Sequence, residues 1–308
     1  MFNLFFAGSG SKNTNLLKRE LSCNQLLSQL NERKAILDWV DYLKNHPDCT
    51  SKLFIDSGAF SAHTKGKSVD VDDYIKFINE IDDYVFVFAQ VDKIPGEFRK
   101  EKTPEQLASA PKESWDNYLY MVDKVKSRDK LLPVFHQGED FKWLTNMLEY
   151  RHPDGKPIEY IGISPANDVH VNDKREWIER VFKTIKNSSN PNVKTHAFGM
   201  TSLNLLEIYP FTSADSTSWI LYGAMGTIMT KYGTKITSDR RLKSPDHILN
   251  LPKEYKEEFE KYLDRYNLTL EDVMKTGDKR EEFNLRFMHE WATNYTSKNN
   301  NTYKKSLL

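Results

Sequence analysis

The sequence is poor in cysteine and has no long apolar run. Only two cysteines, Cys23 and Cys49, occur in 308 residues, and both lie early in the chain. Neither a disulfide framework nor a cysteine-rich zinc site is therefore expected. No apolar stretch approaches the roughly 20 residues of a membrane helix, and the first residues lack the pattern of a signal peptide. We therefore expect a cytoplasmic protein with no membrane partner.

The sequence also has no excess of charge of either sign. Lys and Arg total 44, and so do Asp and Glu, which argues against a surface that binds nucleic acid non-specifically. One stretch at 231–243, KYGTKITSDRRLK, departs from this balance. Its basic residues are Lys231, Lys235, Arg240, Arg241 and Lys243. They predict a nucleic-acid contact, with a solvated loop as the alternative.

Strand-like and helix-like segments alternate along most of the chain. Seven apolar runs of strand length occur, at 3–7, 52–55, 84–91, 131–135, 160–163, 193–198 and 211–214. They are apolar throughout, which is typical of parallel strands buried on both faces, and segments with helical spacing separate them. The pattern predicts an α/β protein with a (β/α)8 TIM barrel over residues 1–250.

Three further segments complete this prediction. The leucines of NQLLSQLNERKAILDWVDYLKN at 24–45 lie largely along one stripe, which predicts a helix. The eighth strand is placed at 235–237. Beyond residue 250 the pattern is wholly helical, so we predict a C-terminal helical extension at 251–296 and a polar, flexible tail at 297–308.

Polar residues follow the predicted strands. They are Asp56 and Ser57, Asp92, His136, Gln137 and Gly138, Ser164 and Asn167, Gly199, and Asp215 and Ser216. Each alone is compatible with a turn or a helix cap. In a β/α barrel, however, the residues after the strands face one common mouth. Paired carboxylates there would suit chemistry at a glycosidic carbon, where one acts as nucleophile and the other as acid.

Several short motifs in this region resemble one enzyme family. DSGAFS at 56–61 resembles the DSGGFQ signature of the tRNA-guanine transglycosylase (queuine tRNA-ribosyltransferase) barrel. VFVFAQVDKIPG, PVFHQG and YIGIS resemble the family's next turns in order, and HAFGMTSLNLLEIYPFTSADSTSW at 196–219 resembles its catalytic segment. The resemblance implies a cofactor-free enzyme that exchanges guanine in a nucleic acid for a free 7-deazaguanine base such as preQ0.

The resemblance also implies roles for individual residues. Asp215 would be the nucleophile and Asp56 the acid/base, while Asp92 and Gln137 would read the purine edge. We expect Phe60 to stack on the base. The remaining residues expected at the substrate are Ser57, Gly58, His136, Gly138, Gly162, Ile163, Ser164 and Gly199. For His136, a pocket wall, a general base and a packed core histidine all remain open.

The chain departs from the tRNA enzymes at their zinc site. That site uses closely spaced cysteines and a histidine late in the chain, which have no counterpart here, so no metal is expected. The zinc-less, DpdA-like branch found in phages is the nearest resemblance, and we therefore expect DNA as substrate, with tRNA as the alternative. A nucleosidase or DNA glycosylase on the same barrel, a degenerate barrel that only binds, and any oligomeric state also remain open.

Overall fold

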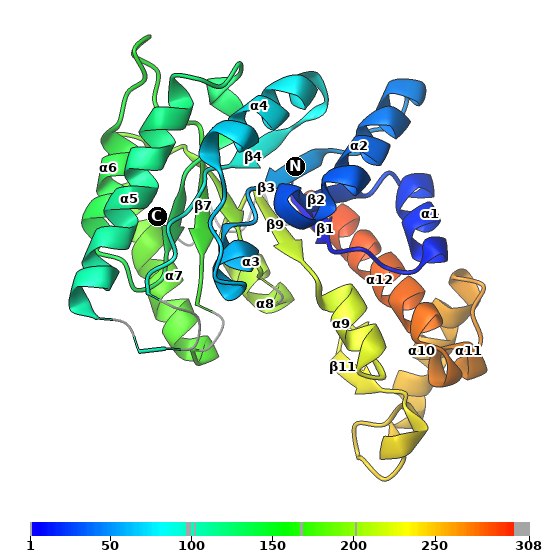
Figure 1. Ribbon diagram of the computed structural model, residues 1–308. Coiled ribbons are helices and arrows are strands. Elements are labelled where there is room, and N and C mark those ends of the chain that lie inside the picture. The colour runs from blue at the N-terminus through cyan, green and yellow to red at the C-terminus, as the bar shows by residue number, and fades with distance from the viewer. Residues whose placement is uncertain (1, 97–99, 102, 167–168, 201, 299–308) are drawn as a thin grey trace. The chain divides into compact units, whose positions relative to one another are not determined.

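The computed structural model describes residues 2–96, 100–101, 103–166, 169–200 and 202–298 (Figure 1). Asn167 and most of the predicted tail lie outside the described residues. The chain divides into two compact units. The terminal unit combines Met1–Cys23 with Ser216–Leu308, and the central unit is Asn24–Asp215. The domain boundaries at 250 and 296 stay a prediction.

The central unit is built on a parallel sheet. Its strands are β2 (Asn24–Ser28), β3 (Leu53–Asp56), β4 (Val87–Ala89), β5 (Leu131–Leu132), β6 (Val134–His136), β7 (Tyr160–Ser164), β8 (Lys194–Ala197) and β9 (Ser213–Ser216). From β2 to β5 and from β6 to β9, each strand pairs in parallel with the next. Only Pro133 separates β5 from β6, and its carbonyl accepts from the amide of Gly162 on β7. The two short strands therefore share one position in the sheet.

This sheet curls into a barrel-like form. The ring of Phe54 on β3 lies 4.6 Å, centroid to centroid, from the imidazole of His196 on β8. These strands are four positions apart, which in a flat sheet would separate them by about 19 Å at about 4.8 Å per strand. The contact requires the sheet to bend back on itself. The α/β class and the parallel, barrel-like sheet are therefore confirmed.

Helices connect the strands of this sheet. They are α2 (Gln29–Asn45), α3 (Ala59–Thr64), α4 (Val71–Ile81), α5 (Pro104–Val122), α6 (Phe141–Glu149), α7 (Val171–Lys186) and α8 (Leu203–Ile208), with 3-10 turns at Asp82–Tyr84 and Arg128–Lys130. Asp70 caps α4 by accepting from the amide of Asp73 at 3.0 Å, and Thr103 forms a capping box before α5. α4 packs on α5, and α6 packs on α7 (Figure 1).

Two predictions of secondary structure are wrong. Residues 24–28 form β2, not the start of a helix, and Leu26 and Leu27 pair with Phe54 and Ile55 of β3. The spacing of the leucines is compatible with one face of a helix. Because neither Gly nor Pro separates β2 from α2, the local sequence does not mark the boundary between the strand and the helix. Residues 235–237 do not supply a barrel strand, because β11 (Gly233–Ile236) pairs antiparallel with β10 (Thr227–Thr230).

The terminal unit is mostly helical. Besides the β10–β11 hairpin it contains β1 (Asn3–Ala7), α1 (Lys12–Glu20), α9 (Ser218–Ala224), α10 (Lys253–Arg265), α11 (Leu270–Lys275) and α12 (Gly277–Lys298), with 3-10 turns at Asp239–Arg241 and Ile248–Asn250. Trp219 is fully buried, and its indole N–H donates to the carbonyl of Ala7 at 3.1 Å. Asn284 on α12 binds the amide of Met229 at 2.7 Å. The C-terminal helices agree with the predicted helical pattern after residue 250.

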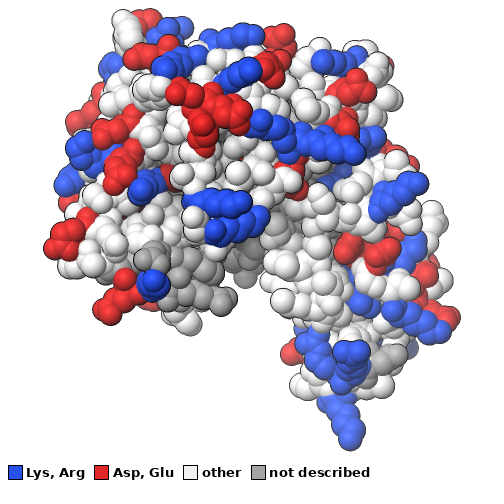
Figure 2. Space-filling view, in the orientation of Figure 1, with Lys and Arg blue, Asp and Glu red and all other residues white. Residues whose placement is uncertain are grey.

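Charge of both signs covers the molecular surface in view. Figure 2 shows Lys and Arg interspersed with Asp and Glu, as the equal totals of basic and acidic residues predict. Basic side chains gather over the segment that follows β11, at the lower end of the view (Figure 2). Within the described part of the chain, no helix is both long and apolar enough to cross a membrane.

Candidate active site

Three carboxylates of the central unit lie at or after the carboxyl ends of its strands. Asp56 is the last residue of β3, Asp92 follows β4, and Asp215 lies near the end of β9. The charges of Asp92 and Asp215 both contribute to raising the pKa of Asp56. Asp56 therefore feels the charge of both other carboxylates.

Asp56 retains a proton near neutral pH. Burial is the main cause that raises its pKa, to about 7, and the charges of Asp92, Asp215 and Glu32 add to it. The amide of Gly58 donates to Oδ2 at 2.9 Å and opposes the shift. A carboxyl group with this pKa can both give and take a proton at pH 7, as a general acid/base must.

Gly58 is required by the turn that places this amide. Its φ is +81°, in the left-handed region that favours glycine. A Cβ at this position would also lie 2.5 Å from Cβ of Leu30 and 2.7 Å from Oγ of Ser28. The C-terminal end of β2 and the residue Leu30 just after it therefore pack against the turn at residues 56–58. The prediction of a single helix over 24–45 does not place Ser28, Leu30 and Glu32 near Asp56, so the sequence analysis does not identify these neighbours.

His136 lies between two acids. Its Nε2 is 3.2 Å from Oδ2 of Asp92, and its Nδ1 is 3.0 Å from Oε1 of Glu139. Gln90 fixes the other oxygen of Asp92 through an Nε2–Oδ1 hydrogen bond of 2.7 Å. Burial lowers the pKa of His136, but the two carboxylates outweigh it and raise the pKa to about 10. An imidazolium has no lone pair to accept a proton, so this geometry favours a role in holding Asp92 over a general base.

Glu139 is a functional residue that sequence reasoning missed. Its Oε2 also accepts the backbone amide of His136 at 3.1 Å, so it binds both the main chain and the ring of that residue. The available signal was an acid three positions after a histidine at a strand end. That spacing is common at turns, which is why it did not stand out.

Asp215 is buried and held by one of its two oxygens. Its Oδ1 accepts the amide of Gly199 at 2.8 Å and lies 3.2 Å from Nε2 of His196. No described residue forms a hydrogen bond to Oδ2. Gly199 has a φ of +58°, again in the left-handed region, and this turn aims its amide at Asp215. Burial lowers the pKa of His196, and the hydrogen bond and charge of Asp215 oppose that shift.

Gln137 has one half of its side-chain amide engaged. Its Oε1 accepts the amide of Ala166 at 3.1 Å, and its own backbone amide donates to the carbonyl of Ser164 at 2.9 Å. Among the described residues nothing binds its Nε2, which leaves two N–H donors. The adjacent Gly138 has a φ of +101° and open space where a Cβ would lie. No described atom therefore crowds this turn at Gly138.

Gly162 and Ile163 are engaged in the sheet. The amide of Gly162 donates to Pro133, and the carbonyl of Ile163 accepts from Phe198 at 2.9 Å. A Cβ at Gly162 would lie 2.5 Å from Cε2 of Phe198 and 2.8 Å from Cδ2 of Leu132. Packing of the barrel interior therefore accounts for this glycine, and close approach of a base is not needed to explain it.

Ser57 and Phe60 differ in exposure. Ser57 is buried, and its carbonyl accepts from Nε2 of Gln29 at 3.2 Å. Phe60, on α3, is 61% exposed. A large aromatic side chain exposed to this extent, four residues after Asp56, is available to stack on a flat ligand.

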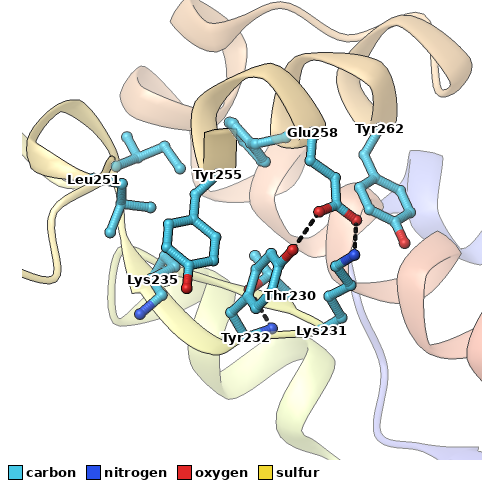
Figure 3. Close-up of a pocket in the computed structure, with 10 residues that line it drawn as sticks. Thr230, Lys231, Tyr232, Lys235, Leu251, Tyr255, Glu258 and Tyr262 are labelled. Atoms are coloured by element: carbon cyan, nitrogen blue, oxygen red, sulfur yellow. Dashed lines mark hydrogen bonds and ion pairs between the residues drawn. The ribbon is translucent and has the colours of Figure 1, made fainter. Parts of the chain in front are cut away.

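The five basic residues of 231–243 lie in the terminal unit and differ in their pairing. Lys231 pairs with Glu258 on α10, beside a pocket of about 20 Å³, the size of one water (Figure 3). Lys235 pairs with Asp246 at 3.4 Å. Arg241 donates to the carbonyl of Met225 at 2.6 Å. Arg240 and Lys243 are exposed and have no partner among the described residues.

The candidate site consists of three carboxylates, two histidines in different charge states and a glutamine. In the described part of the chain, no three His, Cys, Asp or Glu side chains are arranged to hold a metal ion.

No known protein family matches the sequence, and comparison with curated protein sequences finds no match either.

Proposed function

We propose that this chain is a cytoplasmic transglycosylase that exchanges guanine in DNA for a free 7-deazaguanine base such as preQ0. The observation that carries the proposal is the presence of two carboxylates in different surroundings. Asp56 has a pKa of about 7, whereas Asp215 has one oxygen held by a backbone amide and a histidine. One acid suits proton transfer and the other suits nucleophilic attack.

The chemistry has two steps. In the first, a carboxylate oxygen of Asp215 forms a bond to C1′ while the C1′–N9 bond breaks, and its electron pair leaves with guanine. Asp56 gives its proton to the departing base. In the second, the incoming base returns a proton to Asp56 and attacks C1′, which releases Asp215. One N-glycosidic bond replaces another, so no energy source is needed.

Other residues of the cluster fit recognition of a purine-like base. Asp92, fixed by His136 and Gln90, would accept from the N–H edge of the base. Gln137 would donate its unengaged Nε2 to the base carbonyl, and Phe60 would stack on the ring. We take the sheet as a (β/α)8 barrel with its site at the carboxyl ends of the strands. The target guanine must then leave the DNA stack, at a cost of a few kcal/mol.

Guanine release from labelled DNA, with and without added preQ0, tests this proposal. We expect release only when preQ0 is present, and mass spectrometry of the nucleosides should show the 7-deazaguanine in the DNA. Release that ignores preQ0 would instead support a nucleosidase or DNA glycosylase. Exchange into tRNA but not DNA would support the tRNA enzyme, and no release from either would leave a binding protein.

Asp215→Asn tests the nucleophile. An amide cannot form the covalent intermediate, so we expect exchange to fall by about 10³-fold or more while DNA affinity stays within about twofold. Asp38→Asn is the matched control, because it makes the same change on an exposed position of α2 and should leave exchange unaltered. Full exchange by Asp215→Asn would reject the assignment.

A further inference from the structure

A chain of buried side-chain hydrogen bonds runs from Asp215 into the interior of the central unit. Nε2 of His196 faces Oδ1 of Asp215 at 3.2 Å, and Nδ1 of the same ring lies 2.5 Å from Oγ of Ser213. The hydroxyl of Tyr160 is also hydrogen-bonded to Oγ of Ser213. His196 and Ser213 are fully buried and Tyr160 is nearly so. Three neighbouring strands, β7, β8 and β9, supply these residues.

The chemistry of its two ends fixes the direction of this chain. Oδ1 of Asp215 already accepts from the amide of Gly199, so we assign it as the acceptor from His196 as well and place the proton between them on Nε2. Burial lowers the pKa of His196, which keeps the ring neutral and makes Nδ1 an acceptor for the hydroxyl of Ser213. Burial raises the pKa of Tyr160, so its hydroxyl keeps its proton and donates to Ser213. Every donor then meets one acceptor.

The register of the sheet places the members of this hydrogen-bond chain next to one another. His196 on β8 lies directly opposite Ser213 on β9, and Asp215 lies two residues further along β9, on the same face. Phe54 and Phe198 contact the imidazole, with ring centroids 4.6 and 4.5 Å away. Two aromatic rings and hydrogen bonds at both nitrogens thus hold the imidazole in place.

We propose that His196 is a positioning residue for Asp215, and that the Tyr160–Ser213–His196 chain selects Oδ2 as the attacking oxygen. His196 and the amide of Gly199 both bind Oδ1, which leaves Oδ2 without a hydrogen bond from any described residue. Ser213 holds the Nε2–H tautomer that makes His196 a donor. The assignment of Oδ2 as the attacking oxygen rests on the proposed function, whereas the assignment of the Nε2–H tautomer of His196 does not.

Nitrogen-15 NMR of histidine-labelled protein tests the tautomer without an activity assay. We expect His196, assigned by its loss in His196→Gln, to show a protonated Nε2 and an unprotonated Nδ1, and to titrate only below the ordinary pKa of 6.5. Ser213→Ala should shift the Nδ1 resonance. A protonated Nδ1, or a titration near pH 6.5, would overturn the proposal even if base exchange is observed.

Paired variants of His196 test its role in catalysis. Glutamine places an N–H donor where Nε2 of histidine lies, whereas asparagine places one where Nδ1 lies. We expect His196→Gln to keep at least a tenth of kcat and His196→Asn to lose about 100-fold, with KM for the free base within twofold in both. Ser213→Ala should lose about threefold to tenfold. Equal losses in both His196 variants, or a change confined to KM, would reject a positioning role.

These two measurements separate the two proposals. If wild-type protein shows the expected tautomer but exchanges no base, the proposed function fails and the hydrogen-bonded chain stands. If exchange is observed with the wrong tautomer, the positioning role fails and the function stands. Thermal unfolding of each variant shows whether it is folded, and Ser213→Ala, which removes a single oxygen, provides a second test if a His196 variant does not fold.

Discussion

The imidazole of His136 separates the carboxylates of Asp92 and Glu139, at 3.2 and 3.0 Å from its two nitrogens. His196 instead has a carboxylate at one nitrogen and a hydroxyl at the other. Two acids raise the pKa of His136 to about 10 despite burial, whereas burial prevails at His196 and lowers its pKa. One candidate site therefore holds one charged and one neutral imidazole.

His136 is expected to stay protonated up to about pH 10. Its pKa is raised in the folded state, so its pairing stabilises the fold fully below about pH 6.5 and progressively less as pH rises through 10. Glu139→Gln removes one of the two acids and should lower the pKa of His136, which NMR titration measures. Titration of His136 near pH 6.5 in the wild-type protein would show that the two ion pairs do not form.

Asp56 is expected to reduce stability at neutral and alkaline pH. Its folded pKa of about 7 lies above the ordinary 3.8, so the folded state binds the extra proton and the free energy of unfolding falls as pH rises from about 4 to 7. Asp56→Asn removes this penalty. We expect it to stabilise the protein by about 2–4 kcal/mol at pH 8 and to have little effect at pH 4.

Urea unfolding at both pH values measures the effect of Asp56→Asn. Asp38→Asn, on exposed α2, is the control and should leave the unfolding free energy unchanged at either pH. An Asp56→Asn variant that is no more stable than wild type at pH 8 would mean that Asp56 is already ionised at little cost.

Gly162 is expected to tolerate no side chain. A Cβ would lie 2.5 Å from Phe198 and 2.8 Å from Leu132, so Gly162→Ala should destabilise the protein by about 1–3 kcal/mol through overpacking. Adding Phe198→Leu to this variant removes ring atoms from the clash and should recover part of the loss. A double variant that shows purely additive losses would exclude this packing explanation.

Phe60 is expected to affect substrate binding and not folding. It is 61% exposed, so Phe60→Ala should leave the thermal midpoint within about a degree. Loss of base stacking, worth about 1–3 kcal/mol, should raise KM for the free base by roughly fivefold to 150-fold. Phe60→Tyr retains a stacking ring and should behave like wild type, and an equal loss in both variants would argue against stacking.

The basic residues of 231–243 are expected to contribute unequally to DNA affinity. Arg240 and Lys243 have no partner among the described residues, so each can bind a phosphate without breaking an ion pair. Reversing both charges should lower the dependence of log K on log salt by about 2. Lys231→Glu with Lys235→Glu should also disturb the pairs with Glu258 and Asp246. An unchanged salt slope in the Arg240 and Lys243 variant would identify a solvated loop.

The hydrophobic pattern alone was sufficient to predict most of the sheet. Strands buried on both faces have few polar residues, and that property is local, so β3, β4 and β7 could be recognised without knowledge of their neighbours. The same local reasoning failed at β2. Leu26 and Leu27 are compatible with a strand or a helix, and only their pairing with Phe54 and Ile55 decides between the two.

The sequence by itself determined which strands end in acids, because Asp56, Asp92 and Asp215 each follow an apolar run. Only the tertiary structure decided the electrostatic surroundings of those acids. The pKa of Asp56 and the hydrogen bonds of His196 depend on groups that are distant in the chain and close in space. Coulomb energies depend on the distance between these groups, and hydration energies depend on their burial. The curl of the sheet determines both.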